Sequence, residues 1–194
     1  MYSMATVNDP HMNIPTFLTF IRIGLIPIFV LAYYLPVTWA NIATTAIFVL
    51  AGVTDWFDGY LARRLNQTSA FGAFLDPVAD KLMVAVALIL LMQTHPNAWM
   101  AVPAAIIIGR EITVSALREW MAELGKRAHV AVSFLGKYKT ALQILALILL
   151  LYHKPLLGLP TQLIGFALLY LAAGLTVWSM FVYLETAWTV LRAK

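Results

Sequence analysis

Cysteine is absent from this 194-residue chain, and charged residues are scarce at 11%. The lack of cysteine excludes disulfides, thiolate nucleophiles, iron–sulfur clusters and cysteine-based zinc sites. A soluble domain carries about a quarter charged residues, whereas here 62% of residues are hydrophobic and the mean hydropathy is +0.83. This composition excludes a soluble globular protein. Any bound metal must be held by oxygen or imidazole.

Long apolar runs account for most of the chain. They are too continuous for the alternating strands of a barrel, and only helices and closed barrels satisfy every backbone group in lipid. We therefore predict an all-α integral membrane protein, a bundle of six transmembrane helices that forms a single domain over residues 1–194. The predicted spans are Ile14–Tyr34, Ile42–Leu61, Phe74–Met92, Trp99–Met121, Ala141–Leu157 and Leu163–Leu184.

Basic residues are missing from one set of connections. The segments 35–41 and 93–98 contain no Lys or Arg, and Lys154 is the only basic residue near the end of the fifth span. The other connections and the C-terminus hold the remaining clusters of basic residues, so the positive-inside rule predicts that both termini are cytoplasmic. The net charge of +4 therefore reflects membrane topology, and no nucleic-acid partner is expected.

Four aspartates lie at the ends of two neighbouring apolar spans: Asp55, Asp58, Asp76 and Asp80. Carboxylates near the membrane interior are costly and are functional by default. The spacings i,i+3 and i,i+4 place each pair on one helical face, and the short polar turn between the spans allows the two faces to converge. Convergent oxygen ligands favour hard cations, so we expect Mg²⁺ or Mn²⁺, as a pair of ions. The alternative is a set of loop carboxylates paired with neighbouring basic residues.

Small residues accompany the aspartates. Gly59, Ala62 and Gly72 leave room for a ligand beside the carboxylates, and their other interpretation is close helix packing. With them, the spacing Asp55-x-x-Asp58-Gly59-x-x-Ala62-Arg63, eight residues, Gly72-x-x-x-Asp76-x-x-x-Asp80 resembles the full signature of the CDP-alcohol phosphotransferases. The segments Asn13–Arg22 and Gly109–Lys126 resemble the bacterial members of this family that use glycerol 3-phosphate as acceptor.

The resemblance implies a metal-dependent enzyme of phospholipid biosynthesis. Its expected reaction transfers the phosphatidyl group from CDP-diacylglycerol to sn-glycerol 3-phosphate, giving phosphatidylglycerophosphate and CMP. It implies that Asp55, Asp58 and Asp76 bind two cations, with Asp80 completing the site and acting as general base. The residues implied in donor binding are Gly59, Ala62, Arg63, Gly72, Thr19 and Arg22. A homodimer in the bacterial inner membrane, with a cytoplasmic active site, is also expected.

Basic residues in the fourth and fifth spans are candidates for binding the acceptor phosphate. Arg110 lies deep in its span, and Arg118 follows eight residues later on about the same face. Lys137 and Lys139 begin the fifth span and either bind the acceptor or only fix topology. Glu111 follows Arg110 in the sequence, Arg118 and Arg22 are alternative partners for it, and its role stays open. Arg22 itself has two open roles, contacting the donor phosphate or pairing with an aspartate.

Two other functions remain open from the sequence. A sister enzyme of the same family would use another acceptor, which the aspartate signature alone does not exclude. A cation transporter also carries intramembrane carboxylates, but here they gather toward one side of the membrane. Release of CMP from the donor distinguishes the enzymes from the transporter.

Overall fold

The computed structural model describes residues 14–65, 70–123, 134–156 and 158–192, and at some of these positions, Asp58, Arg63 and Lys137 among them, it describes only the backbone. Within these ranges the chain forms six helices and no strand apart from one isolated bridge. The helices are α1 (Ile14–Tyr34), α2 (Ala40–Leu65), α3 (Ala70–Thr94), α4 (Ala98–Glu123), α5 (Phe134–Tyr152) and α6 (Thr161–Arg192). The predicted all-α architecture is confirmed.

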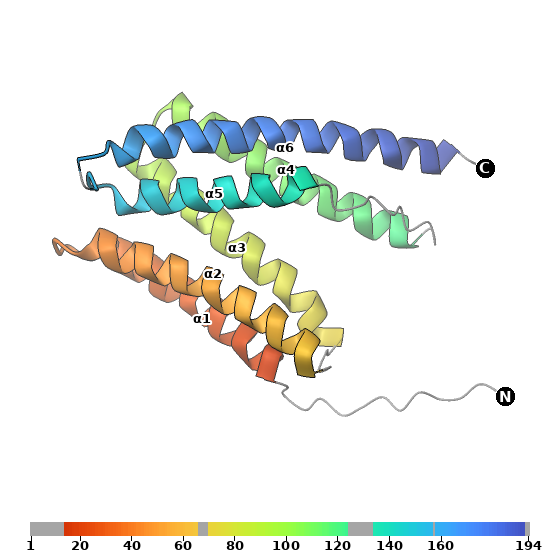
Figure 1. Ribbon diagram of the computed structural model, residues 1–194, viewed down its shortest axis with the longest axis horizontal. Coiled ribbons are helices and arrows are strands. Elements are labelled where there is room, and N and C mark those ends of the chain that lie inside the picture. The colour runs from red at the N-terminus through yellow and green to blue at the C-terminus, as the bar shows by residue number, and fades with distance from the viewer. Residues whose placement is uncertain (1–13, 66–69, 124–133, 157, 193–194) are drawn as a thin grey trace.

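The helices run up and down along one bundle (Figure 1). The most extensive packing joins α1 to α2 and α5 to α6, while α4 packs on α6 and α3. Helix α3 crosses between the two groups and contacts α1, α2, α4 and α5. The start of α1, the end of α2, the start of α3 and the end of α6 therefore lie toward the same end of the bundle (Figure 1), which we name the aspartate end.

The outer surface of the bundle is suited to lipid. Large apolar side chains are exposed along the helices, and Trp99 and Leu163 each keep about seven-tenths of their surface accessible, 71% and 70%. By length and composition, three segments can cross a membrane: Phe17–Tyr34, Ala98–Glu123 and Thr161–Glu185. Shorter apolar segments lie in α2 and α5, and α3 carries three charged residues in its first half. The chain is a multi-pass membrane protein.

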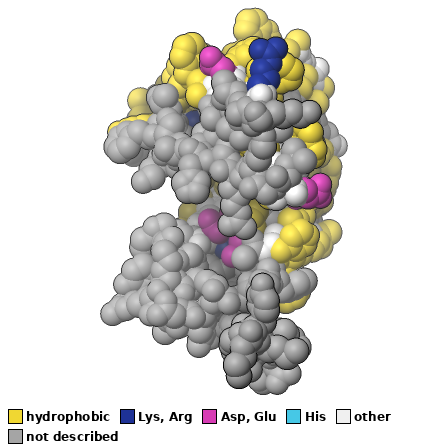
Figure 2. Space-filling model, turned by 90° about the vertical axis from the view of Figure 1, so that its right-hand side faces the viewer, with side chains coloured by type: hydrophobic (Ala, Val, Ile, Leu, Met, Phe, Trp, Pro, Cys, Tyr) yellow, Lys and Arg dark blue, Asp and Glu magenta, His cyan; other side chains and the backbone are white. Residues whose placement is uncertain are grey.

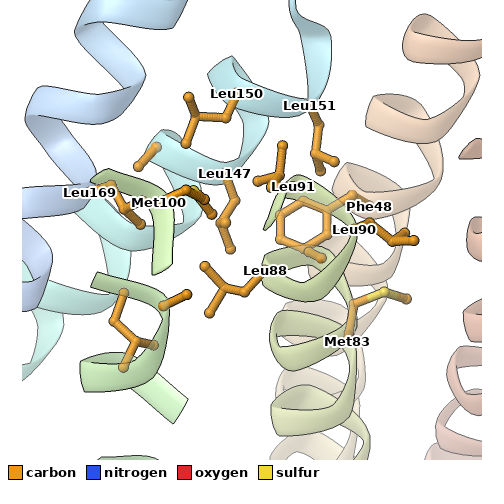
Figure 3. Close-up of a cluster of buried hydrophobic side chains, with 14 of the residues drawn as sticks. Phe48, Met83, Leu88, Leu90, Leu91, Met100, Leu147, Leu150, Leu151 and Leu169 are labelled. Atoms are coloured by element: carbon orange, nitrogen blue, oxygen red, sulfur yellow. The ribbon is translucent and has the colours of Figure 1, made fainter. Parts of the chain in front are cut away.

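Apolar side chains from all six helices fill the interior of the bundle. Figure 3 shows Leu88 and Leu91 of α3 lying between Phe48 of α2 and Leu147 of α5, and Phe29 of α1 joins the same cluster. Met100 and Leu169 extend this core to α4 and α6. Because α3 lies at its centre, the core fixes the position of the helix that carries two of the four aspartates.

Helix α5 differs from the predicted fifth span at both ends. It begins at Phe134, seven residues before Ala141, and it ends at Tyr152 and not at Leu157. The prediction for its end was wrong because His153 adopts a left-handed backbone conformation (φ 61°) and Pro155 follows, which together stop a helix. The earlier start places Lys137 and Lys139 inside the helix.

Candidate active site

The first turns of α3 point two carboxylates at α1. Asp76 and Asp80 lie one helical turn apart on one face, as predicted. The hydroxyl of Thr19 donates a hydrogen bond to Asp76, and the guanidinium of Arg22 donates one to Asp80 at 2.7 Å. Pro77 lies inside the helix between the two acids, where it removes one backbone hydrogen bond. Thr19 and Arg22 therefore hold both acids from one face of α1.

Arg22 joins three helices. Its Nη1 atom lies 2.7 Å from Oδ1 of Asp80 and also 2.7 Å from Oδ1 of Asp55 on α2. Because Oδ1 of Asp55 and Oδ1 of Asp80 contact the same nitrogen atom, they cannot lie further apart than twice 2.7 Å. Arg22 is 1% exposed, whereas the side chains of Asp55 and Asp80 keep 43% and 46% of their surface accessible. The buried cation therefore draws two acids together while leaving them open on their other sides.

A cavity of about 430 Å³ opens beside these acids, between α2, α3 and α5. Asp55, Asp80 and Arg22 line one part of it, and apolar residues such as Phe48 and Ile148 line another. This volume lies in the range of small-molecule sites. Figure 2 views the bundle from the aspartate end and shows acidic and basic side chains together in a recess near the middle of this face.

A second charged cluster links α4 to α5. Oε1 of Glu111 lies 2.6 Å from Nη1 of Arg110 and 3.3 Å from Nζ of Lys139. Of the partners left open for Glu111, the structure shows among the described contacts its neighbour Arg110 and not Arg118 or Arg22, and it adds Lys139, which the earlier start of α5 brings within reach. Lys139 is buried, at 4% exposed, and Arg110 is largely buried.

Arg118 lies apart from this cluster. Its guanidinium carbon is 5.7 Å from the centre of the Tyr183 ring on α6, a cation–π contact at an exposed position. The structure thus brings Arg110 and Lys139 together and leaves Arg118 two turns closer to the aspartate end. The side chains of Asp58, Arg63 and Lys137 lie outside the described part of the structure.

The donor atoms at the aspartate end suit a hard cation. Among the described side chains, no group of three His, Cys, Asp or Glu residues is close enough to form a metal site, but this set does not include the carboxylate of Asp58. The acids that are described present oxygen atoms alone, which is the ligand chemistry of Mg²⁺ and Mn²⁺. The residues therefore fit a divalent cation in their chemistry.

Two polar residues of the cavity were not predicted. Thr140 and Gln143 of α5 line it together with Asp55 and Asp80. The only signal in the sequence is a Thr and a Gln in the polar first half of an otherwise apolar helix, with Gln143 one turn after Lys139. Such a signal does not show which neighbouring helix the residues face.

A family model described as CDP-alcohol phosphatidyltransferase matches residues 12–178, which include the aspartates, Arg22 and the Glu111 cluster. The chain belongs to the CDP-alcohol phosphatidyltransferase family. A member from Pectobacterium atrosepticum, named CDP-diacylglycerol--glycerol-3-phosphate 3-phosphatidyltransferase, is 59% identical over 175 residues, covering 90% of this chain and 94% of the relative. Relatives of the same name from Pseudomonas fluorescens and Yersinia pestis are 57% identical, covering 93% and 92% of this chain and 93% and 97% of their own lengths.

Proposed function

We propose that this protein transfers the phosphatidyl group of CDP-diacylglycerol to sn-glycerol 3-phosphate, forming phosphatidylglycerophosphate and releasing CMP. The observation that carries the proposal is the buried Arg22, which gathers Asp55 and Asp80 at the mouth of a cavity. The relatives whose names state this reaction match nearly the whole chain at 57–59% identity. The reaction is an enzymatic transfer between two phosphate-bearing substrates inside a membrane protein.

In the proposed step, the C1 hydroxyl oxygen of the acceptor forms a bond to the phosphorus that carries diacylglycerol. The bond from this phosphorus to the bridging oxygen breaks, and CMP leaves with the bond's electron pair. Asp80 accepts the proton of the attacking hydroxyl, because its carboxylate lines the cavity and is half exposed. The ion pair with Arg22 keeps Asp80 in place beside the reacting groups.

We assign the binding of two divalent cations to Asp55, Asp58, Asp76 and Asp80. When bound, such cations would neutralise the donor diphosphate and the charge left on CMP. Thr19 and Arg22 orient three of these acids through their hydrogen bonds, so the carboxylates are held in place before any ligand arrives. Titration of the EDTA-treated protein with each ion distinguishes Mg²⁺ from Mn²⁺.

The donor is assigned to the same end of the bundle. Gly59, Ala62 and Arg63 belong to the last turns of α2, and Gly72 is buried in the first turn of α3. Their small size suits the close approach of the cytidine diphosphate to the helix backbones, and Arg63 supplies a charge for its phosphate. Thr19 and Arg22 would contribute to donor binding chiefly by ordering the acids.

The acceptor phosphate is assigned to Arg110 and Lys139. Two cations and one carboxylate leave this cluster with a net positive charge, which suits a phosphate group. We keep Arg118 and Lys137 as further acceptor residues on the path from the aspartate end. The cluster lies on α4 and α5, which both contact α3, the helix that carries Asp76 and Asp80. The acceptor phosphate and its hydroxyl group can therefore be bound on the two sides of one substrate site.

The enzyme is placed in the bacterial inner membrane with the aspartate end in the cytoplasm. Both described chain ends lie at that end (Figure 1), and the positive-inside rule assigns it to the cytoplasm. Homodimerisation and a single catalytic domain over residues 1–194 remain predictions. Cross-linking of the protein in native membranes tests the dimer.

The first experiment measures CMP release by the purified protein in detergent with CDP-diacylglycerol, Mg²⁺ and one acceptor at a time. Release with glycerol 3-phosphate, abolished by EDTA and restored by Mg²⁺ or Mn²⁺ titration, supports the proposal. Release only with serine, an inositol phosphate or phosphatidylglycerol would indicate a sister enzyme. No release with any acceptor would contradict the proposed enzymatic activity and would favour cation transport.

Two acid-to-amide variants separate the proposed roles. Asp80→Asn should lower turnover by about 10²–10⁴-fold, the usual contribution of a general base, while donor binding persists. Asp55→Asn should lose metal-dependent donor binding. Glu119→Gln, an exposed acid of α4 outside the site, is the matched control and should behave as the parent protein. Donor affinity that survives Asp55→Asn unchanged contradicts the metal assignment.

A further inference from the structure

Gln143 is a buried polar residue that the proposed mechanism does not use. It lies in the interior of α5, is 6% exposed, and lines the cavity that also contains Asp55 and Asp80. No hydrogen bond joins its side chain to another residue in the described part of the chain. The fully buried polar atoms without a partner in the described part of the chain do not include its amide nitrogen or oxygen. The amide is therefore accessible from the cavity, where a bound molecule can satisfy it. Its amide therefore points to a polar group of a ligand in the cavity.

The position of Gln143 on α5 relates it to the charged cluster. Lys139 and Gln143 are separated by four residues, so they share one face of the helix with their Cβ atoms about 5–6 Å apart. Lys139 contacts Glu111, which also binds Arg110. The Nε atom of Arg110 is buried, and no described residue accepts a hydrogen bond from it. From the aspartate end toward the membrane interior, the basic cluster therefore comes first and the uncharged amide of Gln143 follows it.

This order of groups matches a short molecule with a phosphate at one end and hydroxyl groups at the other. A phosphate held by Lys139 and Arg110 leaves the attached carbon chain to extend by about one helical turn. Gln143 then lies beside the hydroxyl-bearing carbons, and Asp80 lines the same cavity. The acyl chains of the donor are less suited to the position of Gln143, because hydrocarbon chains have no donor or acceptor for a hydrogen bond with its amide.

We propose that Gln143 binds the C2 hydroxyl of glycerol 3-phosphate and thereby directs the C1 hydroxyl toward Asp80. This inference rests on the proposed function. The side-chain carbonyl of Gln143 accepts the hydrogen of the C2 hydroxyl, or its amide donates to the hydroxyl oxygen. Gln143 is then a residue that determines acceptor specificity, since an acceptor without this hydroxyl leaves the amide buried and without a partner.

The test compares glycerol 3-phosphate with 3-hydroxypropyl phosphate, which has the same phosphate and primary hydroxyl but lacks the C2 hydroxyl. The parent protein should prefer glycerol 3-phosphate by about tenfold or more in kcat/KM, the effect of one lost hydrogen bond with a buried group left unpaired. In Gln143→Met, which keeps the length and removes the amide, the preference should fall to about twofold or less, because only the reaction with glycerol 3-phosphate is weakened.

Gln162→Met is the matched control. Gln162 of α6 donates a hydrogen bond to the backbone of Leu150 at 3.2 Å, near the end of the bundle opposite to the aspartates. This control should keep the acceptor preference of the parent protein. The comparison of the two acceptors in the unsubstituted protein tests the proposal even where Gln143→Met does not fold.

Three outcomes would overturn the inference. Equal use of the two acceptors by the parent protein contradicts it directly. A Gln143→Met variant that loses activity equally with both acceptors indicates a structural role, and one that raises only the donor KM indicates a donor contact. Each of these leaves the proposed function intact, whereas failure of the parent protein to release CMP with glycerol 3-phosphate contradicts the proposed function itself.

Discussion

Replacing Arg22 by methionine tests the central ion-pair arrangement. Arg22 is 1% exposed and lies 2.7 Å from both Asp55 and Asp80. Removing one partner of a fully buried ion pair destabilises a protein by about 3–5 kcal/mol. Because the two carboxylates are nearly half exposed and can be solvated, we expect a smaller loss of about 2–3 kcal/mol for Arg22→Met.

Thermal unfolding in detergent measures this loss. For a chain of this size, a loss of about 2–3 kcal/mol corresponds to roughly 5–10 °C in Tm. Arg118→Met removes an exposed arginine that contacts only the face of Tyr183 among the described interactions, so it should cost less than about 1 kcal/mol. Equal melting temperatures for Arg22→Met and the parent protein would refute the reasoning.

Arg22→Lys separates charge from shape. Both acids are contacted through one nitrogen atom, Nη1, so a single ammonium that reached this point would satisfy them. The lysine side chain is a point charge without the planar guanidinium. We therefore expect Arg22→Lys to recover part of the stability that Arg22→Met loses, and a lysine variant no more stable than the methionine variant would show that charge contributes little.

Three further predictions concern packing, pH and metal. A Cβ on Gly165 would lie 2.8 Å from Cγ of Leu150, so Gly165→Ala should lower stability by about 1–3 kcal/mol, whereas Gly174→Ala, where a Cβ meets nothing within 4 Å, should be neutral or stabilising in the same melting assay. Burial and the nearby His153 lower the pKa of His95 from 6.5, so the unfolded state binds more protons than the folded state. The contribution of His95 to stability should therefore be fully present above about pH 6.5 and should be lost as the pH falls below it. His95→Gln should flatten this part of a Tm–pH profile. Mg²⁺ should raise the Tm of the parent protein but not of Asp55→Asn, and an equal rise in both would place the ion elsewhere.

The sequence was sufficient for the helices and for the acidic residues of the site. Apolar runs of about 20 residues are typical of membrane helices. Helix α1 therefore matches its predicted bounds, and α2, α3, α4 and the start of α6 lie within a few residues of theirs, whereas α5 and the end of α6 differ more. The spacings of Asp55, Asp76 and Asp80 place them on helical faces without knowledge of tertiary structure. The structure brings these three acids to α1, as their spacing allowed.

Contacts between helices were harder to predict. A helical pattern shows which residues share a face but not which other helix that face meets. The sequence left Arg118 and Arg22 open as partners of Glu111, whereas in the structure the long side chain of Lys139 reaches it from α5. Lys139 was placed at a boundary because the predicted span began at Ala141. Only the full length of α5 shows that this lysine is buried and faces the interior.

The alignment of α1 with α3 explains how the acids are held in place. Thr19 bonds to Asp76 and Arg22 to Asp80, at sequence separations of 57 and 58 residues. At the other end of the same helices, the hydroxyl of Tyr33 donates to the backbone of Leu90 at 2.7 Å, again 57 residues away. A nearly constant separation means that α1 and α3 run parallel in one register between these contacts.

This register has a consequence for the charge balance of the site. Carboxylates that face one another across two helices repel, and a bundle held together only by apolar contacts could relieve the repulsion by sliding or separating the helices. Here the tyrosine contacts at the far end oppose such a slide, while Arg22 neutralises part of the charge where it is concentrated. The acids of α3 are therefore held at fixed positions by a helix that contributes no acid of its own to the site. Placing the hydroxyl and the guanidinium on α1 leaves the exposed sides of Asp55 and Asp80 available to ligands.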